Sequence, residues 1–288
     1  MQENVKIIDA FTFYNNVDIL KMRLQLHYDY VDEFYICEAD HTYSGKPKEF
    51  ILEQNLHKIA PWIDKVRYIK YYADLTGLDF SLEFKDEILN LNNPAWIMEF
   101  RQRNELQKHI KDFGNNDIIA ICDIDEFIDH RVFQYIKSGS PLPDQVRLNM
   151  VMHNNYMNCV QPKKIWTHPF ICKGSKFREI PDISFHRHAV GMYHWWPDAG
   201  WHFSNLGGFE AIMDKLVTSC HTEYVTNGVN DPEYIKNCMK YGVYPNIKKE
   251  PPSLSKCDFA FVRLDVYPEY LRKIMLENPK YIVTDLNV

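Results

Sequence analysis

The sequence predicts an α/β fold in which a mostly parallel sheet is flanked by helices. Two observations support this class. Over residues 1–140, strand-like segments alternate with helical ones, as in parallel sheets with crossover helices. The apolar run Ile118–Cys122 is also typical of a central parallel strand that is buried on both faces. We expect the 288 residues to form one domain.

The N-terminal elements follow from local patterns. Residues 5–12 and 33–39 read as strands, and the amphipathic stretch 19–26 between them reads as a helix with asparagine and aspartate residues placed to cap it. Residues 41–48 contain a glycine and a proline and are predicted to form a loop. A third strand is expected over residues 65–71.

A helix is predicted before the apolar run, because Pro94 suits a first helical turn and Gly114 lies just beyond the end. Its apolar stripe also includes Arg103. A guanidinium on a core-facing stripe needs an anionic partner. That partner is either Glu99 or an acid of the neighbouring strand, or it is a ligand; the sequence leaves both open.

The pattern changes after residue 140. Two prolines mark a break, and residues 146–156 and the short aromatic segments up to Trp201 indicate mixed β and loop structure. A helix is expected to start at Gly207-Gly-Phe-Glu210 and to end near Cys220. Residues 268–278 are predicted to form a short covering helix.

Composition narrows the function classes. The net charge of −6 argues against a sequence-independent nucleic-acid surface. No signal peptide and no apolar run of about eighteen residues is visible, so we expect no transmembrane helix and a cytoplasmic location. The seven cysteines are scattered, without Cys-x-x-Cys pairs, which favours reduced and buried thiols.

Two carboxylates, Asp123 and Asp125, end the apolar run one residue apart. Alternate residues of an extended chain point to the same side, and the carboxyl ends of strands are where open α/β sheets bind ligands. Oxygen pairs suit hard divalent cations such as Mg²⁺ or Mn²⁺, which neutralise phosphates. The alternative is a helix cap followed by a solvated turn.

An ordered set of segments resembles glycosyltransferase family 17. Each segment is a weak signal alone, but their order and rough spacing are those of the family. They include the motifs Ile121-Cys-Asp-Ile-Asp-Glu126 and Gly207-Gly-Phe-Glu210. The other matching segments are 9–18, 20–26, 31–40, 43–48, 100–104 and 199–204.

The resemblance implies a GT-A fold, a nucleotide-sugar donor, a divalent metal (Mn²⁺ or Mg²⁺) on the Asp-x-Asp motif and inversion at the anomeric carbon. It favours UDP-N-acetylglucosamine as donor and a glycan or other hydroxyl as acceptor. Residues 1–140 would bind the nucleotide-sugar and residues 141–288 the acceptor. Two features depart from the family: Asn16 replaces an expected acid, and the anchor of Golgi members is not seen, which argues against Golgi N-glycans as acceptor.

In that family context, four residues are metal candidates. Asp125 is expected to coordinate most directly, and Asp123 to reach the metal or the ribose. His202, in Gly-Trp-His, is the leading third ligand, and His221 is the runner-up. Most of the twelve histidines must be structural or solvated.

Five further residues are candidates for the donor side. Arg103 and Asn104 are expected to hold Asp123 or to touch the nucleotide. Lys46 would approach a phosphate, although exposed loop lysines are usually only solvated. Asp40 belongs to an acid pair at the end of the second strand, and Trp201 would stack on a sugar, with a core position as the alternative.

For the base that deprotonates the acceptor hydroxyl, we expect Glu210, at the start of a helix, with Asp198 as the runner-up. The alternative for Glu210 is a first-turn acid that only offsets the helix dipole. Two other classes stay open: a metal-dependent nucleotidyltransferase or phosphohydrolase, and a non-catalytic carbohydrate-binding protein. The sequence does not reveal the acceptor, the linkage or the oligomeric state.

Overall fold

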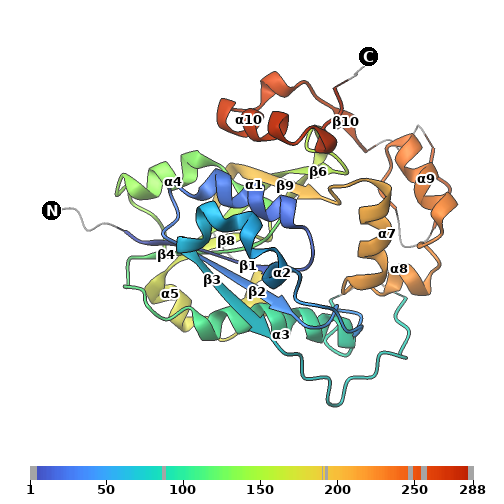
Figure 1. Ribbon diagram of the computed structural model, residues 1–288, viewed down its shortest axis with the longest axis horizontal. Helices are drawn as coiled ribbons and strands as arrows, with labels where there is room; N and C mark the ends of the chain where they lie inside the picture. The colour runs from blue at the N-terminus through green and yellow to red at the C-terminus, as the bar shows by residue number, and fades with distance from the viewer. Residues whose placement is uncertain are drawn as a thin grey trace.

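A central sheet organises the computed structural model, which describes residues 5–85, 89–189, 191, 194–245, 249–253 and 258–284 (Figure 1). Four parallel strands from the N-terminal half stand in the order β3-β2-β1-β4. Their bounds are Ile7–Phe13 (β1), Glu33–Ala39 (β2), Val66–Tyr71 (β3) and Ile118–Asp123 (β4). These strands lie within one or two residues of the predicted ones.

The pairing register aligns the carboxyl ends of the middle strands. Thr12 of β1 lies opposite Asp123 of β4, and Phe13 lies opposite Glu38 of β2. The β4 residues Ile118–Cys122 are buried, as the continuous apolar run predicts. Asp123 therefore stands at the ligand-binding edge of a parallel sheet.

The C-terminal half extends the sheet with mixed pairing. β8 runs antiparallel to β4, and β6 pairs antiparallel with β7 and β8 but parallel with β9. The short β5 pairs antiparallel with β9, which places Glu126 opposite His202. These strands are Glu126–Ile128 (β5), Gln145–Asn154 (β6), Cys159–Trp166 (β7), Phe170–Lys173 (β8), His194–Ser204 (β9) and Ala260–Phe261 (β10).

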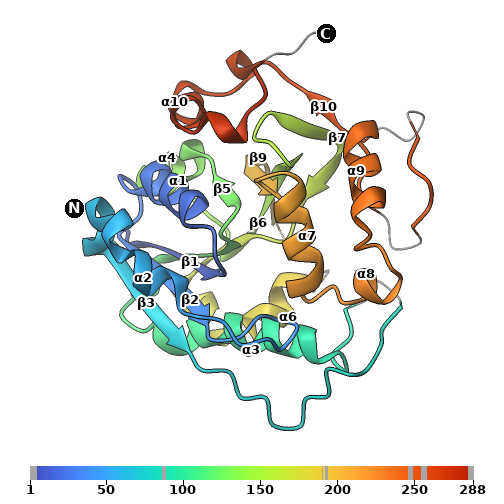
Figure 2. The same ribbon diagram turned by 45° about the vertical axis from the view of Figure 1, so that its right-hand side comes forward.

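Helices cover both faces of the sheet (Figures 1 and 2). On one face lie α1 and α4, with α10 against α1; on the other lie α3, α5 and α6. A separate group, α7 to α9, stands beside the sheet. The helices are Val17–His27 (α1), Ile51–Asn55 (α2), Pro94–His109 (α3), His130–Lys137 (α4), Gly174–Glu179 (α5), Ile183–His188 (α6), Phe209–Thr218 (α7), Glu223–Thr226 (α8), Pro232–Tyr241 (α9) and Glu269–Glu277 (α10). The 3₁₀ segments are Leu56–Lys65, Leu264–Val266 and Pro279–Tyr281.

Local capping signals explain where several helices begin. The Asn16 side chain accepts a hydrogen bond from the backbone N–H of Ile19 at the start of α1, and Asn93 caps α3 ahead of Pro94. The predicted covering helix is α10, which packs with Trp201 and Phe203 in one apolar cluster.

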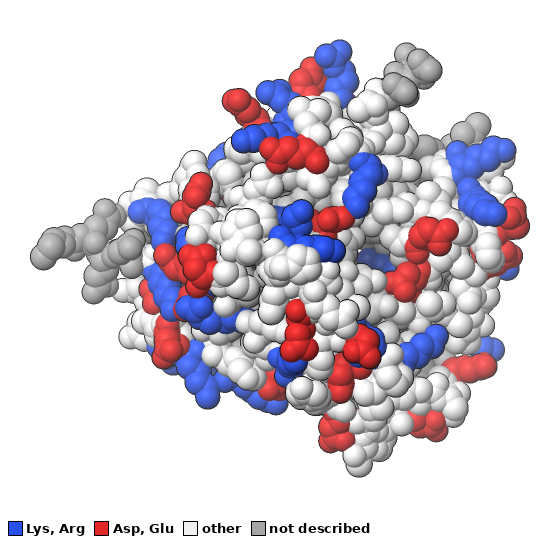
Figure 3. Space-filling view, viewed as in Figure 1, with Lys and Arg blue, Asp and Glu red and all other residues white. Residues whose placement is uncertain are grey.

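The predicted α/β fold, with a sheet flanked by helices and a mixed C-terminal region, is confirmed. Of the seven cysteines, the six that fall within the described residues are buried and form no disulfide, as expected, and Cys257 lies outside those residues. Over the same part of the chain, no helix is both long and apolar enough to cross a membrane. Positive and negative side chains are interspersed on the face shown in Figure 3.

Candidate active site

A cavity of about 590 Å³ opens at the carboxyl ends of β1, β2 and β4, a volume within the range of small-molecule sites. Strand ends supply Thr12, Ala39 and Asp123, and helices α3 and α7 supply further parts of the wall. Predicted site residues on its lining are Arg103, Asp123, Asp125, His202, Glu210 and His221. The fold thus brings together residues that are far apart in the sequence.

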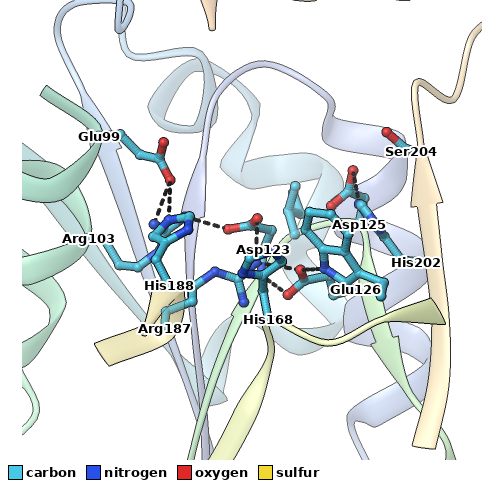
Figure 4. Close-up of polar contacts among 12 residues, drawn as sticks. Glu99, Arg103, Asp123, Asp125, Glu126, His168, Arg187, His188, His202 and Ser204 are labelled. Atoms are coloured by element: carbon cyan, nitrogen blue, oxygen red, sulfur yellow. Dashed lines mark hydrogen bonds and ion pairs between the residues drawn. The ribbon is translucent and has the colours of Figure 1, made fainter. Parts of the chain in front are cut away.

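Asp123 is held by two buried arginines. Arg103 of α3 donates from Nη2 to Oδ1 at 2.7 Å, and Arg187 of α6 donates from Nη2 to Oδ2 at 2.7 Å (Figure 4). Loss of solvation would raise the pKa of Asp123, but the charges of Arg187 and Arg103 hold it well below its ordinary value. Arg103 also pairs with Glu99 at 2.6 Å, so both protein partners considered from the sequence are present.

The turn after Asp123 is fixed by buried polar contacts. Arg23 of α1 donates from Nη1 to the carbonyls of Asp123 (3.1 Å) and Glu126 (2.5 Å), and its other nitrogens pair with Asp9 at 2.6 and 2.9 Å. The Glu126 carboxylate accepts the backbone N–H of Asp123 at 2.6 Å. Buried hydrogen bonds therefore fix both the carbonyl groups and the N–H group of this turn.

Asp125 faces His202 across the same turn. The Oδ2 atom of Asp125 lies 3.4 Å from Nε2 of His202, and the two side chains are 17% and 6% exposed (Figure 4). Burial would raise the pKa of Asp125, but His202 and the Lys215 ammonium lower it. The Nδ1 atom of His202 is buried and has no hydrogen-bond partner within the described ranges.

His221 lines the cavity but belongs to a different cluster. Its Nδ1 lies 2.7 Å from the buried carboxylate of Glu223, and its ring packs edge-on against Trp96, 5.0 Å between centroids. The structure thus joins His202, and not His221, to Asp125. Across the residues that the structure describes, no three His, Cys, Asp or Glu side chains form a ready-made metal cluster.

Two glycines shape the start of α7. Gly207 and Gly208 have φ angles of 114° and 71°, which side chains rarely adopt. Glu210 follows in the first turn, exposed at the cavity, with no hydrogen bond or ion pair to the described residues. Lys215, further along α7, also lines the cavity. Sequence reasoning missed Lys215, because a lysine in an amphipathic helix looks like an ordinary solvated one.

The family model for glycosyltransferase family 17 matches residues 1–242. The chain belongs to glycosyltransferase family 17. It is therefore a glycosyltransferase, an enzyme that uses a sugar donor and an acceptor. The matched part includes every cavity residue discussed above.

Solved structures add a distant likeness. The chain resembles the crystal structure of residues 1–349 of TarS from S. aureus, with 11% identity and a TM-score of 0.37, over 81% of this chain and 71% of that chain. No curated protein matches the sequence significantly.

Three other predicted site residues of this family 17 enzyme are not among the described residues that line the cavity, although each is within two positions of one that is. Asn104 accepts the backbone N–H of Ser184 at 3.1 Å and so fixes α6, the helix of Arg187. Asp40 accepts the backbone N–H of Ala73 at 2.9 Å and pairs with His41. Lys46 is exposed in its loop, as its alternative interpretation expects.

Trp201 and Asp198, which the sequence also predicts to be site residues, lie away from the cavity lining in the described chain. Trp201 is 7% exposed in the apolar cluster under α10, so the structure gives it the core position that was the alternative to sugar stacking. Gly200 precedes it because a Cβ there would lie 2.0 Å from the carbonyl oxygen of Phe127. Asp198 is exposed on β9 and is not among the described lining residues, and its carbonyl accepts a hydrogen bond from Arg131.

Proposed function

We propose that this family 17 glycosyltransferase is an inverting, metal-dependent enzyme that moves a sugar from a UDP-sugar to a hydroxyl of a glycan or other acceptor. The observation that carries this proposal is the pair of Asp125 and His202, side by side on the wall of a cavity at the carboxyl ends of parallel strands. The choice of UDP-N-acetylglucosamine as donor rests on the family resemblance.

The donor set suits a divalent cation. Carboxylate oxygens and imidazole nitrogens bind such ions at about 2.0–2.2 Å, so an Oδ2 and an Nε2 that lie 3.4 Å apart can share one ion. The ion, Mn²⁺ or Mg²⁺, would offset charge that grows on the departing diphosphate. Asp123 is less available as a ligand because arginines engage both of its oxygens. We assign Asp123 mainly to holding the turn and its charge balance.

Glu210 is the better candidate for the base. Its carboxylate is exposed at the cavity and no described residue pairs with it, so an acceptor hydroxyl can reach it. Asp198 is also exposed, but it is not among the described residues that line the cavity. In an inverting transfer the base takes the hydroxyl proton while the acceptor oxygen attacks the anomeric carbon.

The two halves of the chain share the cavity. Residues 1–140 provide the strand ends, Arg103 and the Asp pair, and residues 141–288 provide His202, Glu210 and Lys215. We propose one catalytic domain in which the first half binds most of the nucleotide and the second half meets the acceptor. The metal pair would then join the halves.

The test combines binding and turnover. Calorimetric titration of UDP with Mn²⁺ should show binding that weakens sharply in EDTA, and a screen of UDP-, GDP- and dTDP-sugars should give turnover with UDP-N-acetylglucosamine. Asp125→Asn should lose the metal dependence and the turnover. The control Asp144→Asn, on a carboxylate whose side chain is 72% exposed, should change neither.

Two results would overturn the proposal. Full activity of wild type in EDTA, or of Asp125→Asn in Mn²⁺, would remove the metal from the mechanism. Tighter binding of GDP or dTDP than of UDP would leave the enzyme class intact and show that the donor is wrong.

A further inference from the structure

We propose that Lys215 binds the diphosphate of the nucleotide-sugar donor and stabilises it as the leaving group. This inference rests on the proposed function, because it needs a donor with a diphosphate. It adds a residue that no sequence motif indicates. The argument depends on how the positive charges of the cavity are distributed.

Four cationic side chains line the cavity in the described part of the chain: Lys48, Arg103, Arg187 and Lys215. Both arginines already form ion pairs within the protein: Arg103 pairs with the buried Glu99 and with Asp123, and Arg187 pairs with Asp123 and the buried Glu126 (Figure 4). Neither can turn to a ligand without leaving a buried carboxylate unpaired.

Lys48 also has its partners within the protein. Its Nζ lies 2.7 Å from Oε1 of Glu38, a carboxylate with no exposed surface, and donates to the carbonyls of Ala39 and Glu49 at 3.0 Å. Glu38 in turn accepts the backbone N–H groups that begin α2. Lys48 is therefore part of the support of that helix.

Lys215 differs from these three. Its ammonium donates to the hydroxyl oxygen of Ser204 at 3.1 Å, and it forms no ion pair with any residue that the structure describes. The Lys215 side chain is exposed at the cavity that it lines, within a site whose walls are protein. Burial lowers its pKa, but the Tyr244 phenol and the carboxylates Asp125 and Asp123 raise it above the ordinary value, so it stays charged.

The position suits a leaving group. Lys215 lines the same cavity as Asp125 and His202, and its ammonium bonds Ser204, two residues beyond His202 on β9. It therefore stands on the side of the cavity where the proposed metal pair would hold the diphosphate. In the transfer, the bond between the anomeric carbon and the β-phosphate oxygen breaks with its electron pair, and a bond from the acceptor oxygen forms. The proton goes to Glu210, and the nucleoside diphosphate leaves with one more negative charge. An ammonium at that oxygen stabilises the charge as it develops.

The experiment compares ligands with and without the diphosphate. A nucleotide screen by calorimetry in Mn²⁺ first identifies the nucleoside diphosphate that wild type binds best, UDP on our proposal, and its matching nucleoside. Both are then titrated into wild type, Lys215→Met, Lys215→Arg and the control Lys108→Met. Lys108 lies on α3 with its side chain 69% exposed.

We expect Lys215→Met to bind UDP about tenfold to a hundredfold more weakly, as for loss of a charged hydrogen bond, with uridine affinity unchanged. Its turnover should fall at least as much. Lys215→Arg should retain most of the preference for UDP over uridine, and Lys108→Met all of it.

The other outcomes are distinguishable. An unchanged ratio of UDP to uridine affinity in Lys215→Met, or an equal loss for both ligands, overturns the assignment and leaves the proposed function standing. If another diphosphate binds best and Lys215→Met weakens it alone, the UDP donor is wrong and the assignment of Lys215 holds. If wild type binds no nucleoside diphosphate, the proposed function and this inference both fail.

Discussion

Arg23 offers the sharpest test of how the site is built. It has no exposed side-chain surface, pairs with Asp9 through two nitrogens, and donates its remaining nitrogen to carbonyls of the turn that carries Asp123. Arg23→Met removes the cation and retains much of the side-chain volume. Asp9 then stays buried and charged with only His27 beside it, 3.0 Å away.

The expected cost follows from these contacts. Removing one partner of a buried ion pair costs about 3–5 kcal/mol, because the other charge is left uncompensated. Proteins are stable by about 5–15 kcal/mol, so the variant should fold but melt at a clearly lower temperature. The freed turn carbonyls also loosen the backbone of Asp123 and Asp125, so UDP affinity in Mn²⁺ should fall as well.

The assay is denaturant unfolding of Arg23→Met, Asp9→Asn and the double variant at low temperature. The double variant should cost clearly less than the sum of the two single costs, because the amide that replaces the Asp9 carboxylate is neutral and needs no cation. The control is Arg67→Met, which removes a partly exposed pair with Glu33 and should cost under about 1 kcal/mol. A loss below about 1 kcal/mol in Arg23→Met, or additive costs in the double variant, would show that Arg23 does not balance the charge of Asp9.

Two more predictions concern catalysis and pH. Glu210→Gln should keep UDP affinity and lose about 10²–10⁴-fold in turnover, while Asp198→Asn turns over normally; the reverse pattern in transfer assays would assign the base to Asp198. Burial lowers the pKa of His27 to about 4 and that of His153 to about 3, so both are neutral in the folded protein. The unfolded chain takes up these protons below about pH 6.5, so the free energy of unfolding should fall as pH drops toward 4, by about 1.4 kcal/mol per pH unit for each histidine. Urea unfolding at pH 7, 6 and 5 measures this, and equal stabilities would contradict it.

Local sequence patterns were sufficient to predict the features that depend on neighbouring residues. Continuous apolar character over Ile118–Cys122 identified the central strand, and the abrupt change to Asp123 identified its end. Pro94 and the glycines before Phe209 marked where α3 and α7 begin, because those backbone positions accept few residue types. The ordered motifs identified the family.

Which of these groups come into contact depends on how distant segments pack. The sequence could not choose the partner of Arg103, because Asp123 reaches it only when α3 packs against the sheet. The sequence ranked His202 ahead of His221 as a metal ligand but could not show which of them lies beside Asp125. The antiparallel pairing of β5 with β9 brings His202 there.

The same limit applies to Trp201, Asp198 and Lys215. Trp201 and Asp198 lie on the same strand as His202. Side chains of a strand point alternately to opposite faces, and Asp198 is four residues before His202, so Trp201 is buried in the core and Asp198 is exposed to solvent. Lys215 stands out only after the partners of Lys48, Arg103 and Arg187 are known. Periodicity reports which face of an element is buried, whereas the partner of a charge depends on packing between distant segments, which short-range patterns do not encode.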